Sequence, residues 1–322
     1  MSVINGFLAR RSVDTRATLK IFLVLVGLAL LAAVVSEGVF IQPANLVNMI
    51  FQNAILIVIA LAQLLVILTG GIDLSVGAIV AVSSVLVVLF QDYGLAASIG
   101  IALSVAMAFG LINGFLVTYI RLPAFVVTLA TMQIGYSVSR ILSGGGAVYT
   151  GLQGAQIPAG LLDFFKNSFF SIPYPLIITV VFLVGIALYL RTSIGHFAYT
   201  IGGNESAAFI SGIPIRRVKM LVYVLASLLC CVGGILFVAR VGMGDPQAGT
   251  WLPLDSIAAV SIGGASLSGG IGTVSGTLIG VMILSVLNNI MNLLGVPPTL
   301  QPAIKGLVIL VTIYLNSARK QN

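Results

Sequence analysis

Residues 53–91 read NAILIVIALAQLLVILTGGIDLSVGAIVAVSSVLVVLFQ, and this stretch decides the fold class. Two strongly apolar runs flank a short interruption, and Asp73 is the only charged residue between them. A helix that crosses the hydrocarbon core of a bilayer needs about 20 apolar residues. The stretch therefore predicts two membrane helices that are separated by a break at residues 69–75.

Composition extends this prediction to the whole chain. Of its 322 residues, 59% are hydrophobic and 7% are charged, whereas a soluble domain carries about 25% charged residues. We therefore expect residues 1–322 to form a single transmembrane domain. The net charge of +7 is spread between apolar segments, which argues against a nucleic-acid partner. Cys230 and Cys231 are adjacent and lack the spacing of metal ligands, so no metal site is expected.

The apolar runs predict an all-α bundle of about ten transmembrane helices. They cover residues 20–40, 46–69, 76–91, 95–120, 124–142, 174–190, 220–241, 255–268, 272–294 and 300–316. An even number of crossings puts both termini on one side. With cytoplasmic termini, 11 of the 15 basic residues fall on cytoplasmic segments, in agreement with the positive-inside rule. Residues 1–19 then form a cytoplasmic tail, residues 191–219 form a cytoplasmic loop, and residues 143–173 form an outer loop with a short interfacial helix.

A weak internal repeat is visible in the two halves of the chain. The segment GGIDLSVG at 70–77 is echoed by GGASLSGG at 263–270, and each copy is followed by a helix end that contains asparagine. Duplicated halves are common in transporters. In a chain with 36 glycines the same pattern can also recur by chance. We expect an internal repeat with unequal halves.

Asp73 is the charged residue that most needs an explanation. A carboxylate at membrane depth costs at least a few kcal/mol unless it is paired or hydrated. One interpretation places Gly70, Gly71 and Asp73 at an interrupted helix beside the translocation pathway or its cytoplasmic gate. The other makes Asp73 a helix cap that accepts amide hydrogens of the span starting near Val76. The two interpretations are compatible.

Uncharged polar side chains are a second candidate for the pathway. Asn48, Gln52 and Gln63 project within about 60° of one another on a helix, Asn288 and Asn289 belong to a polar stripe on the ninth span, and Gln133 lies alone in the fifth. Neutral donors and acceptors that face a bundle interior suit the hydroxyls of a sugar. The same residue types also form hydrogen bonds between membrane helices.

The segment GGNESAAFISGI at residues 202–213 carries the sharpest local signal. Asn204 is a favourable N-cap, Glu205 suits the first turn, and Gly212 followed by Pro214 ends the helix. The segment therefore predicts a short amphipathic helix outside the membrane. Such a helix can dock into a groove of a partner.

Three motifs carry a resemblance to a known family. The pattern Glu-x-Ala-Ala followed by Gly-Ile resembles the coupling loop of ABC importer permeases. GGNESAAFISGI, GGIDLSVGA and LPLDSIAAVSIGG (residues 252–264) together resemble the ribose-type sugar permease family, over about residues 20–316.

The resemblance implies a permease of the bacterial inner membrane that pairs with a second permease copy. It also implies a cytoplasmic ATP-binding subunit, a periplasmic sugar-binding protein and contact with membrane lipid. The residues assigned by it to coupling with the ATPase are Gly202, Gly203, Asn204, Glu205, Ala207, Ala208, Gly212 and Ile213.

The chain lacks the sequence motif of an ATP-binding loop. No lysine follows a glycine, so the chain lacks a G-x-x-x-x-G-K-[ST] phosphate loop. ATP and Mg are therefore expected on the partner subunit, and the chain itself is not expected to be an enzyme. The alternative is an ion-coupled secondary sugar transporter that uses Asp73. The outer acids Asp163, Asp245 and Asp255 are candidates for contacting the binding protein.

Overall fold

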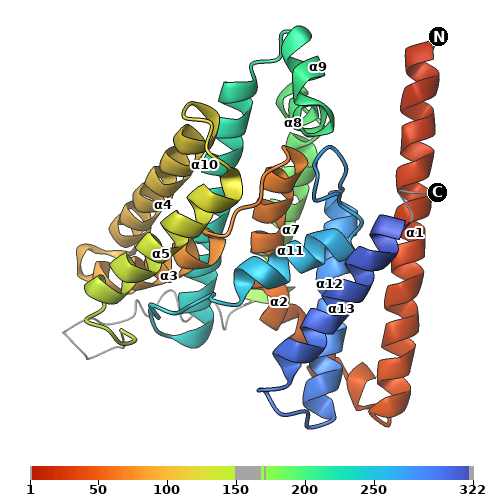
Figure 1. The fold of residues 1–322 in the computed structure, drawn as a ribbon. Helices are drawn as coiled ribbons and strands as arrows, with labels where there is room; N and C mark the ends of the chain where they lie inside the picture. Colours follow the sequence, from red (N-terminus) through yellow and green to blue (C-terminus); the bar gives the residue numbers. More distant parts are fainter. Residues whose placement is uncertain (1, 149–167, 170–171, 319–322) are drawn as a thin grey trace.

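The computed structural model describes residues 2–148, 168–169 and 172–318, and almost all of them are helical (Figure 1). The helices are α1 (Ser2–Val35), α2 (Pro43–Leu68), α3 (Val76–Leu89), α4 (Leu95–Thr118), α5 (Ala124–Leu142), α7 (Tyr174–Tyr189), α8 (Ser193–Gly203), α9 (Glu205–Ile210), α10 (Ile215–Val241), α11 (Leu252–Ile262), α12 (Val274–Leu293) and α13 (Gln301–Ala318). Short 3-10 turns cover Val39–Ile41 and Gln91–Tyr93, and the strands β1 (Ser168–Phe169) and β2 (Ile172–Pro173) pair antiparallel.

Each of the ten predicted segments overlaps a helix, which confirms a polytopic all-α membrane fold. Within the described residues, six helices are long and apolar enough to cross a bilayer, namely α2, α4, α5, α10, α12 and the Thr18–Val35 part of α1. The pair α7 and α8, bent by 73°, raises the number to seven. The apolar helices α3 and α11 span only 14 and 11 residues. Helix length and composition therefore do not establish the count of ten.

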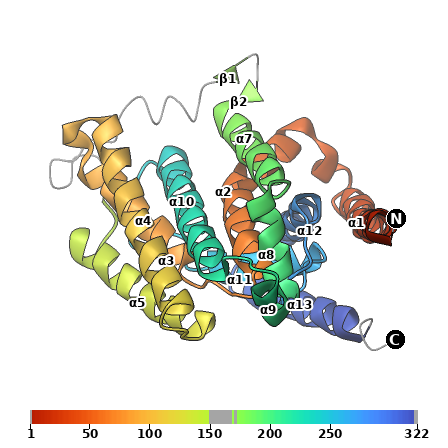
Figure 2. The same ribbon diagram turned by 90° about the horizontal axis from the view of Figure 1, so that it is seen from above.

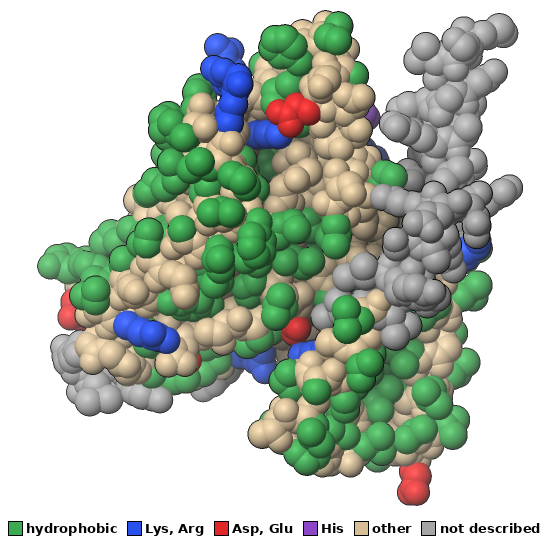
Figure 3. Space-filling model, in the orientation of Figure 1, with side chains coloured by type: hydrophobic (Ala, Val, Ile, Leu, Met, Phe, Trp, Pro, Cys, Tyr) green, Lys and Arg blue, Asp and Glu red, His purple; other side chains and the backbone are tan. Residues whose placement is uncertain are grey.

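Helix α2 forms the centre of the bundle. Every residue from Ala54 to Leu68 is buried, because this half of α2 is apolar around its whole circumference and needs packing partners on all sides. Figure 2 shows α10 beside α2, with α3, α4 and α5 on one side and α7, α11, α12 and α13 on the other. The outer surface is apolar as well, since hydrophobic side chains cover much of the middle of the visible face in Figure 3.

The structure adds detail to two segments expected to connect membrane helices. Residues 191–219 contain α8, α9 and the first turn of α10, so this segment is more helical than the single short helix expected there. Thr192 caps α8 by accepting a hydrogen bond from the Gly195 amide, so a new helix starts directly after α7. The interfacial helix expected within 143–173 falls mostly outside the described residues, and the described part near its end is the β1–β2 hairpin.

Candidate functional site

Two cavities lie at opposite ends of the bundle. The first, here called the basic cavity, has a volume of about 850 Å³ and lies between the break after α2, the α4–α5 turn, α9 and the start of α10. The second, the amide cavity, has a volume of about 240 Å³ and includes the first half of α2 and the end of α10. Tyr223 lines the basic cavity and Arg240 lines the amide cavity. At about 1.5 Å per residue along α10, the two residues are about 25 Å apart.

Uncharged polar side chains dominate the wall of the amide cavity. The lining residues are Met49, Gln52, Asn53, Leu56, Arg240, Trp251, Asp255, Ser285, Asn288, Asn289, Asn292, Gln301 and Lys305. They come from α2, α10, α11, α12, α13 and the residue before α11. The cavity therefore exists only because segments distant in sequence pack together.

Hydrogen bonds join α2 to α12 across this cavity. Asn45 and Asn289 exchange two amide hydrogen bonds of 3.0 and 2.8 Å, and the Asn53 amide donates to Ser285 Oγ at 2.6 Å. Asn288 differs, because its buried Oδ1 has no hydrogen-bond partner among the described residues. This oxygen is a buried, unsatisfied acceptor on a residue that lines the cavity.

Charged groups also reach the amide cavity, and one pair of them corrects an expectation. Lys305 Nζ lies 3.0 Å from Asp255 Oδ2, and the Asp255 residue is only 6% exposed. Asp255 is thus a paired structural carboxylate and not a free loop charge. Asp245 accepts the Gln247 amide at 2.8 Å, and Asp163 lies outside the described residues.

The predicted pathway residues do not share one location. Gln52, Asn288 and Asn289 line the amide cavity. Asn48 is exposed on the same helix as Gln52 without lining the cavity, and Gln133 is exposed on α5. The remaining members, Gln63, Gly70, Gly71 and Asp73, lie at the opposite end of α2. Asn48, Gln52 and Gln63 do lie on one face of α2. Their surroundings differ, because other helices pack around the second half of α2 and bury Gln63 but leave Asn48 exposed.

Asp73 is satisfied by its own segment. Its Oδ1 accepts the Ser75 amide at 2.8 Å and the Ser75 hydroxyl at 2.6 Å. With its amide oriented to suit both groups, Gln63 donates to the Asp73 carbonyl at 2.9 Å and accepts the Asp73 amide at 3.3 Å. The geometry resembles the capping interpretation, since the carboxylate holds the turn that leads into α3. The carboxylate is enclosed, as the residue is 1% exposed.

A chain of hydrogen bonds connects this break to α4 and α5. The Asn113 amide donates to Ser75 Oγ at 2.9 Å, and Thr131 Oγ1 donates to Asn113 Oδ1 at 2.8 Å. In the sequence, Asn113 is recognisable only as the asparagine of the helix end that follows residues 70–77, and Thr131 carries no signal of its own. Their signal was weak, because a single buried amide in an apolar helix does not reveal its partner.

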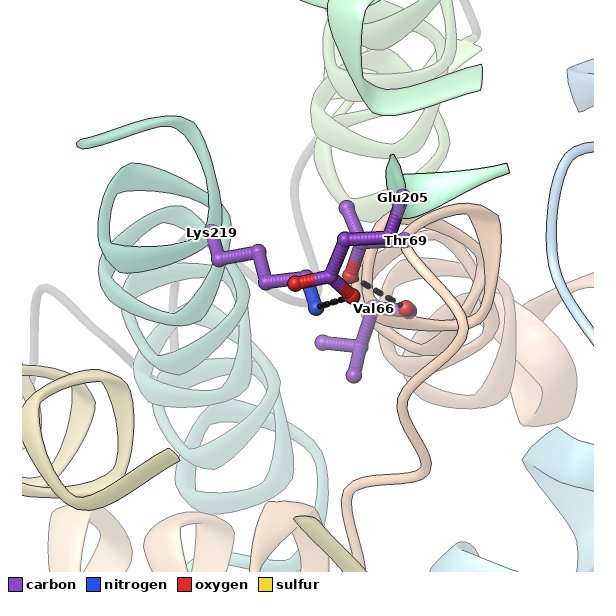
Figure 4. Close-up of polar contacts among 4 residues, drawn as sticks. All are labelled: Val66, Thr69, Glu205 and Lys219. Atoms are coloured by element: carbon purple, nitrogen blue, oxygen red, sulfur yellow. Dashed lines mark hydrogen bonds and ion pairs between the residues drawn. The ribbon is translucent and has the colours of Figure 1, made fainter. Parts of the chain in front are cut away.

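The predicted short helix at 204–212 is confirmed as α9. Asn204 Oδ1 accepts the Ala207 amide at 2.9 Å, and Gly212 follows the helix with a φ of 76°. Ala208 is fully buried, whereas Phe209 and Ile210 are 74% and 85% exposed. Glu205 reaches across the end of α2 to Lys219 of α10, at 2.6 Å, beside the Thr69–Val66 hydrogen bond that closes α2 (Figure 4). Helix α9 therefore exposes two apolar side chains near its end, while Ala208 and the Glu205–Lys219 ion pair hold it against the bundle.

Close backbone packing ties α8 to both glycine breaks. The Gly270 amide donates to the Leu68 carbonyl at 3.1 Å, and Gly202 sits against both residues. A Cβ at Gly202 would overlap the Leu68 carbonyl oxygen and approach Gly270 N to 2.6 Å. Tyr199 of α8 adds a hydrogen bond to the Gly272 carbonyl at 2.9 Å. The two echoed segments and α8 therefore meet at Gly202, which we call the glycine junction.

Comparison with known proteins assigns the family. Residues 45–313 match the family model described as branched-chain amino acid transport system / permease component. The chain belongs to this family of transport permeases. No solved structure matches this permease. Within the described residues, no group of three or more His, Cys, Asp or Glu side chains could hold a metal ion.

The permease also has curated relatives over nearly its whole length. It is 43% identical to the ribose import permease of Bacillus subtilis (strain 168), over 90% of each chain. It is 37% identical to the ribose import permease of Escherichia coli (strain K12), over 92% of this chain and 93% of that one. The xylose transport system permease of Haemophilus influenzae is 30% identical, over 94% and 97% of the two chains. These relatives are transport proteins and not enzymes.

Proposed function

We propose that this chain is the membrane-spanning permease subunit of an ATP-driven importer that carries a monosaccharide, such as ribose or another pentose, across the bacterial inner membrane. The observation that carries the sugar assignment is the amide cavity. Its neutral donors and acceptors match sugar hydroxyls, and the free Asn288 Oδ1 can accept one. Trp251, 47% exposed at the same wall, offers an aromatic face to the ring.

Energy enters, in this proposal, through α9. Phe209 and Ile210 are large apolar side chains exposed at the tip of a capped helix, and such side chains gain stability when a partner covers them. The partner is a cytoplasmic ATP-binding subunit that also holds ATP and Mg. The coupling residues are those from Gly202 to Ile213 that the family resemblance implies.

The glycine junction gives this energy a route into the bundle. A shift of α9 and α8 would press on the break after α2 and on the break after α11, because Gly202 contacts the backbone of both. We propose that two permease copies alternate in this way between outward-open and inward-open states, fed by a periplasmic sugar-binding protein. The same proposal includes ten membrane crossings, a duplicated architecture around the two breaks, and termini in the cytoplasm. The start of α1 and the end of α13 lie toward the α9 end of the bundle, which supports this orientation (Figure 1).

A branched-chain amino acid is the second candidate cargo. The family description names this cargo class, and Arg240, Asp255 and Lys305 line the amide cavity. Opposite charges are what a zwitterion requires. Asp255 and Lys305 already neutralise each other at 3.0 Å, so we favour the sugar.

Reconstituted transport tests the proposal. The permease is placed in vesicles with its ATP-binding subunit and binding protein, and uptake of labelled ribose, xylose and leucine is measured with and without ATP. We expect ATP-dependent uptake of a pentose. Asn288→Leu should reduce that uptake about tenfold, because it removes the free acceptor and fills the cavity. Gln133→Leu, an exposed amide on α5, is the matched control and should leave uptake unchanged.

The rivals give different outcomes in the same assay. Uptake of leucine without any sugar would assign the amino-acid cargo. Uptake that survives ATP depletion but stops when the ion gradient collapses would assign the ion-coupled secondary transporter that uses Asp73. The enclosed, hydrogen-bonded state of the Asp73 carboxylate favours the ATP-driven reading.

A further inference from the structure

The basic cavity carries an excess of positive charge that the proposed sugar path does not need. Its wall contains Arg121, Arg216, Arg217 and Lys219 but only one acidic residue, Glu205. Lys219 and Glu205 neutralise each other at 2.6 Å. The three arginines have no ion-pair partner among the described residues. A cavity of about 850 Å³ thus presents three uncompensated guanidinium groups at its rim.

A residue with an unpartnered hydroxyl, Tyr223, also lines this cavity. Tyr223 is 1% exposed, and its hydroxyl has no hydrogen-bond partner among the described residues. Leaving a buried donor unpaired costs about 1–3 kcal/mol. The hydroxyl lies against Gly71, where a Cβ would approach it to 2.8 Å. It is therefore an enclosed, unpaired donor on a residue that lines the cavity.

The rim of the cavity has an apolar side that fits a membrane surface. Ile120, Leu122 and Phe125 flank Arg121 and are 53%, 43% and 52% exposed. Arg121 itself has a φ of 65°, in the left-handed region that a residue with a Cβ seldom occupies. Arg216 lies over the ring of Tyr119, with its guanidinium carbon 5.5 Å from the ring centre. Cations beside exposed apolar side chains are typical of the level of lipid headgroups.

We propose that the basic cavity binds a phosphate group, carried either by an anionic phospholipid headgroup or by a soluble phosphate ester. Arginine guanidinium groups hold phosphate oxygens by charge-assisted hydrogen bonds. The Tyr223 hydroxyl donates to one further oxygen from inside the cavity. Glu205 opposes the anion and competes for Lys219, so anion binding and the α9 ion pair are linked.

This link gives the site a regulatory position. A phosphate that draws Lys219 away from Glu205 loosens the base of α9, the helix that carries the exposed Phe209 and Ile210. Charge placed by the positive-inside rule alone would explain the arginines. It does not account for the coincidence of these arginines with an unpartnered tyrosine hydroxyl on a residue of the same cavity wall.

Thermal unfolding of the full-length chain in lipid nanodiscs tests the proposal. One arm uses phosphatidylcholine discs and adds inorganic phosphate or glycerol 3-phosphate, with potassium chloride at equal ionic strength as reference. The other arm compares phosphatidylcholine discs with discs that also contain phosphatidylglycerol. We expect stabilisation beyond the chloride reference in at least one arm. The arm that responds identifies the source of the phosphate.

Variants separate a built site from general charge attraction. Tyr223→Phe should weaken the apparent affinity about tenfold, whereas Tyr136→Phe, which removes another buried unpartnered hydroxyl, should not change it. Arg216→Gln should weaken it about two- to fivefold, and Arg191→Gln, an exposed cation outside the cavity, should not.

Glu205→Gln gives a gain of function, since removal of the opposing charge should tighten binding. This readout remains available even if an arginine variant fails to fold. The proposal is overturned if no phosphate probe stabilises the protein beyond chloride. It is equally overturned if Tyr223→Phe, Tyr136→Phe and the native chain respond alike.

Discussion

Replacing Gly202 by alanine should separate α8 from the two glycine breaks. The added Cβ would overlap the Leu68 carbonyl oxygen and lie 2.6 Å from Gly270 N, which is 0.8 Å inside an ordinary contact of 3.4 Å. Both atoms belong to the backbone, so no side chain can rotate to make room. The Gly270–Leu68 hydrogen bond of 3.1 Å joins the same atoms and must lengthen.

The expected cost follows from these contacts. Overpacking a closely packed site costs about 1–3 kcal/mol, and the strained hydrogen bond adds to this. Alanine in a helix recovers about 0.5–1 kcal/mol relative to glycine. We therefore expect a net destabilisation of about 1–2 kcal/mol, together with weaker coupling between ATP hydrolysis and transport.

The neighbouring residue supplies a matched control. Gly203 also lies in α8, and a Cβ there meets no atom within 4 Å. Gly203→Ala should keep or slightly raise stability, and because Gly203 is itself one of the proposed coupling residues, it controls for stability and not for transport. Thermal unfolding of both variants in detergent, and ATPase activity and uptake in vesicles, measure the two effects. If Gly202→Ala unfolds at the same temperature as Gly203→Ala, the glycine junction does not hold α8 against the breaks and the argument fails.

Three further predictions concern charged side chains. Asp73→Asn should have a free energy of unfolding within about 1 kcal/mol of the native chain and should support uptake, because the amide oxygen still accepts hydrogen bonds from the following turn. Asp73→Leu removes this acceptor and should lower the free energy of unfolding by about 1–3 kcal/mol. Loss of uptake in a stable Asp73→Asn protein would speak for ion coupling. Glu205→Lys should place like charges against Lys219 and uncouple the ATPase while the permease still inserts in the membrane, so unchanged transport would remove Glu205 from the docking role. Lys305→Met should cost about 1–3 kcal/mol by stranding the nearly buried Asp255 carboxylate, and adding Asp255→Asn should restore most of the loss in thermal unfolding.

Local signals in the sequence predicted the helices well. The ten apolar segments all overlap helices, because long apolar runs and glycine or proline breaks act within one segment. The N-cap of α9 was predicted from Asn204 for the same reason, since a cap bonds to an amide three residues away. Helix α8, which starts after the Thr192 cap, was not predicted, because a single capping threonine is a weak signal in a polar segment.

The polar stripe of α2 shows the limit of such reasoning. Helical periodicity places Gln52 and Gln63 on one face, and this much is correct. Their surroundings differ, because Gln52 borders the amide cavity while Gln63 binds the backbone of Asp73 inside the bundle. Periodicity gives a direction around one helix axis, but it contains nothing about which other helix lies in that direction.

The sequence by itself determined that this protein is a membrane bundle, where its helices break, and which short segment forms the capped helix α9. These features depend on hydrophobic runs and on contacts within a few residues. Only the tertiary structure decided that the two breaks meet α8 at Gly202, that Asn289 pairs with Asn45, and that Tyr223 lines a basic cavity. Those contacts join residues up to 244 positions apart, and they exist because the apolar α2 draws the other helices around it.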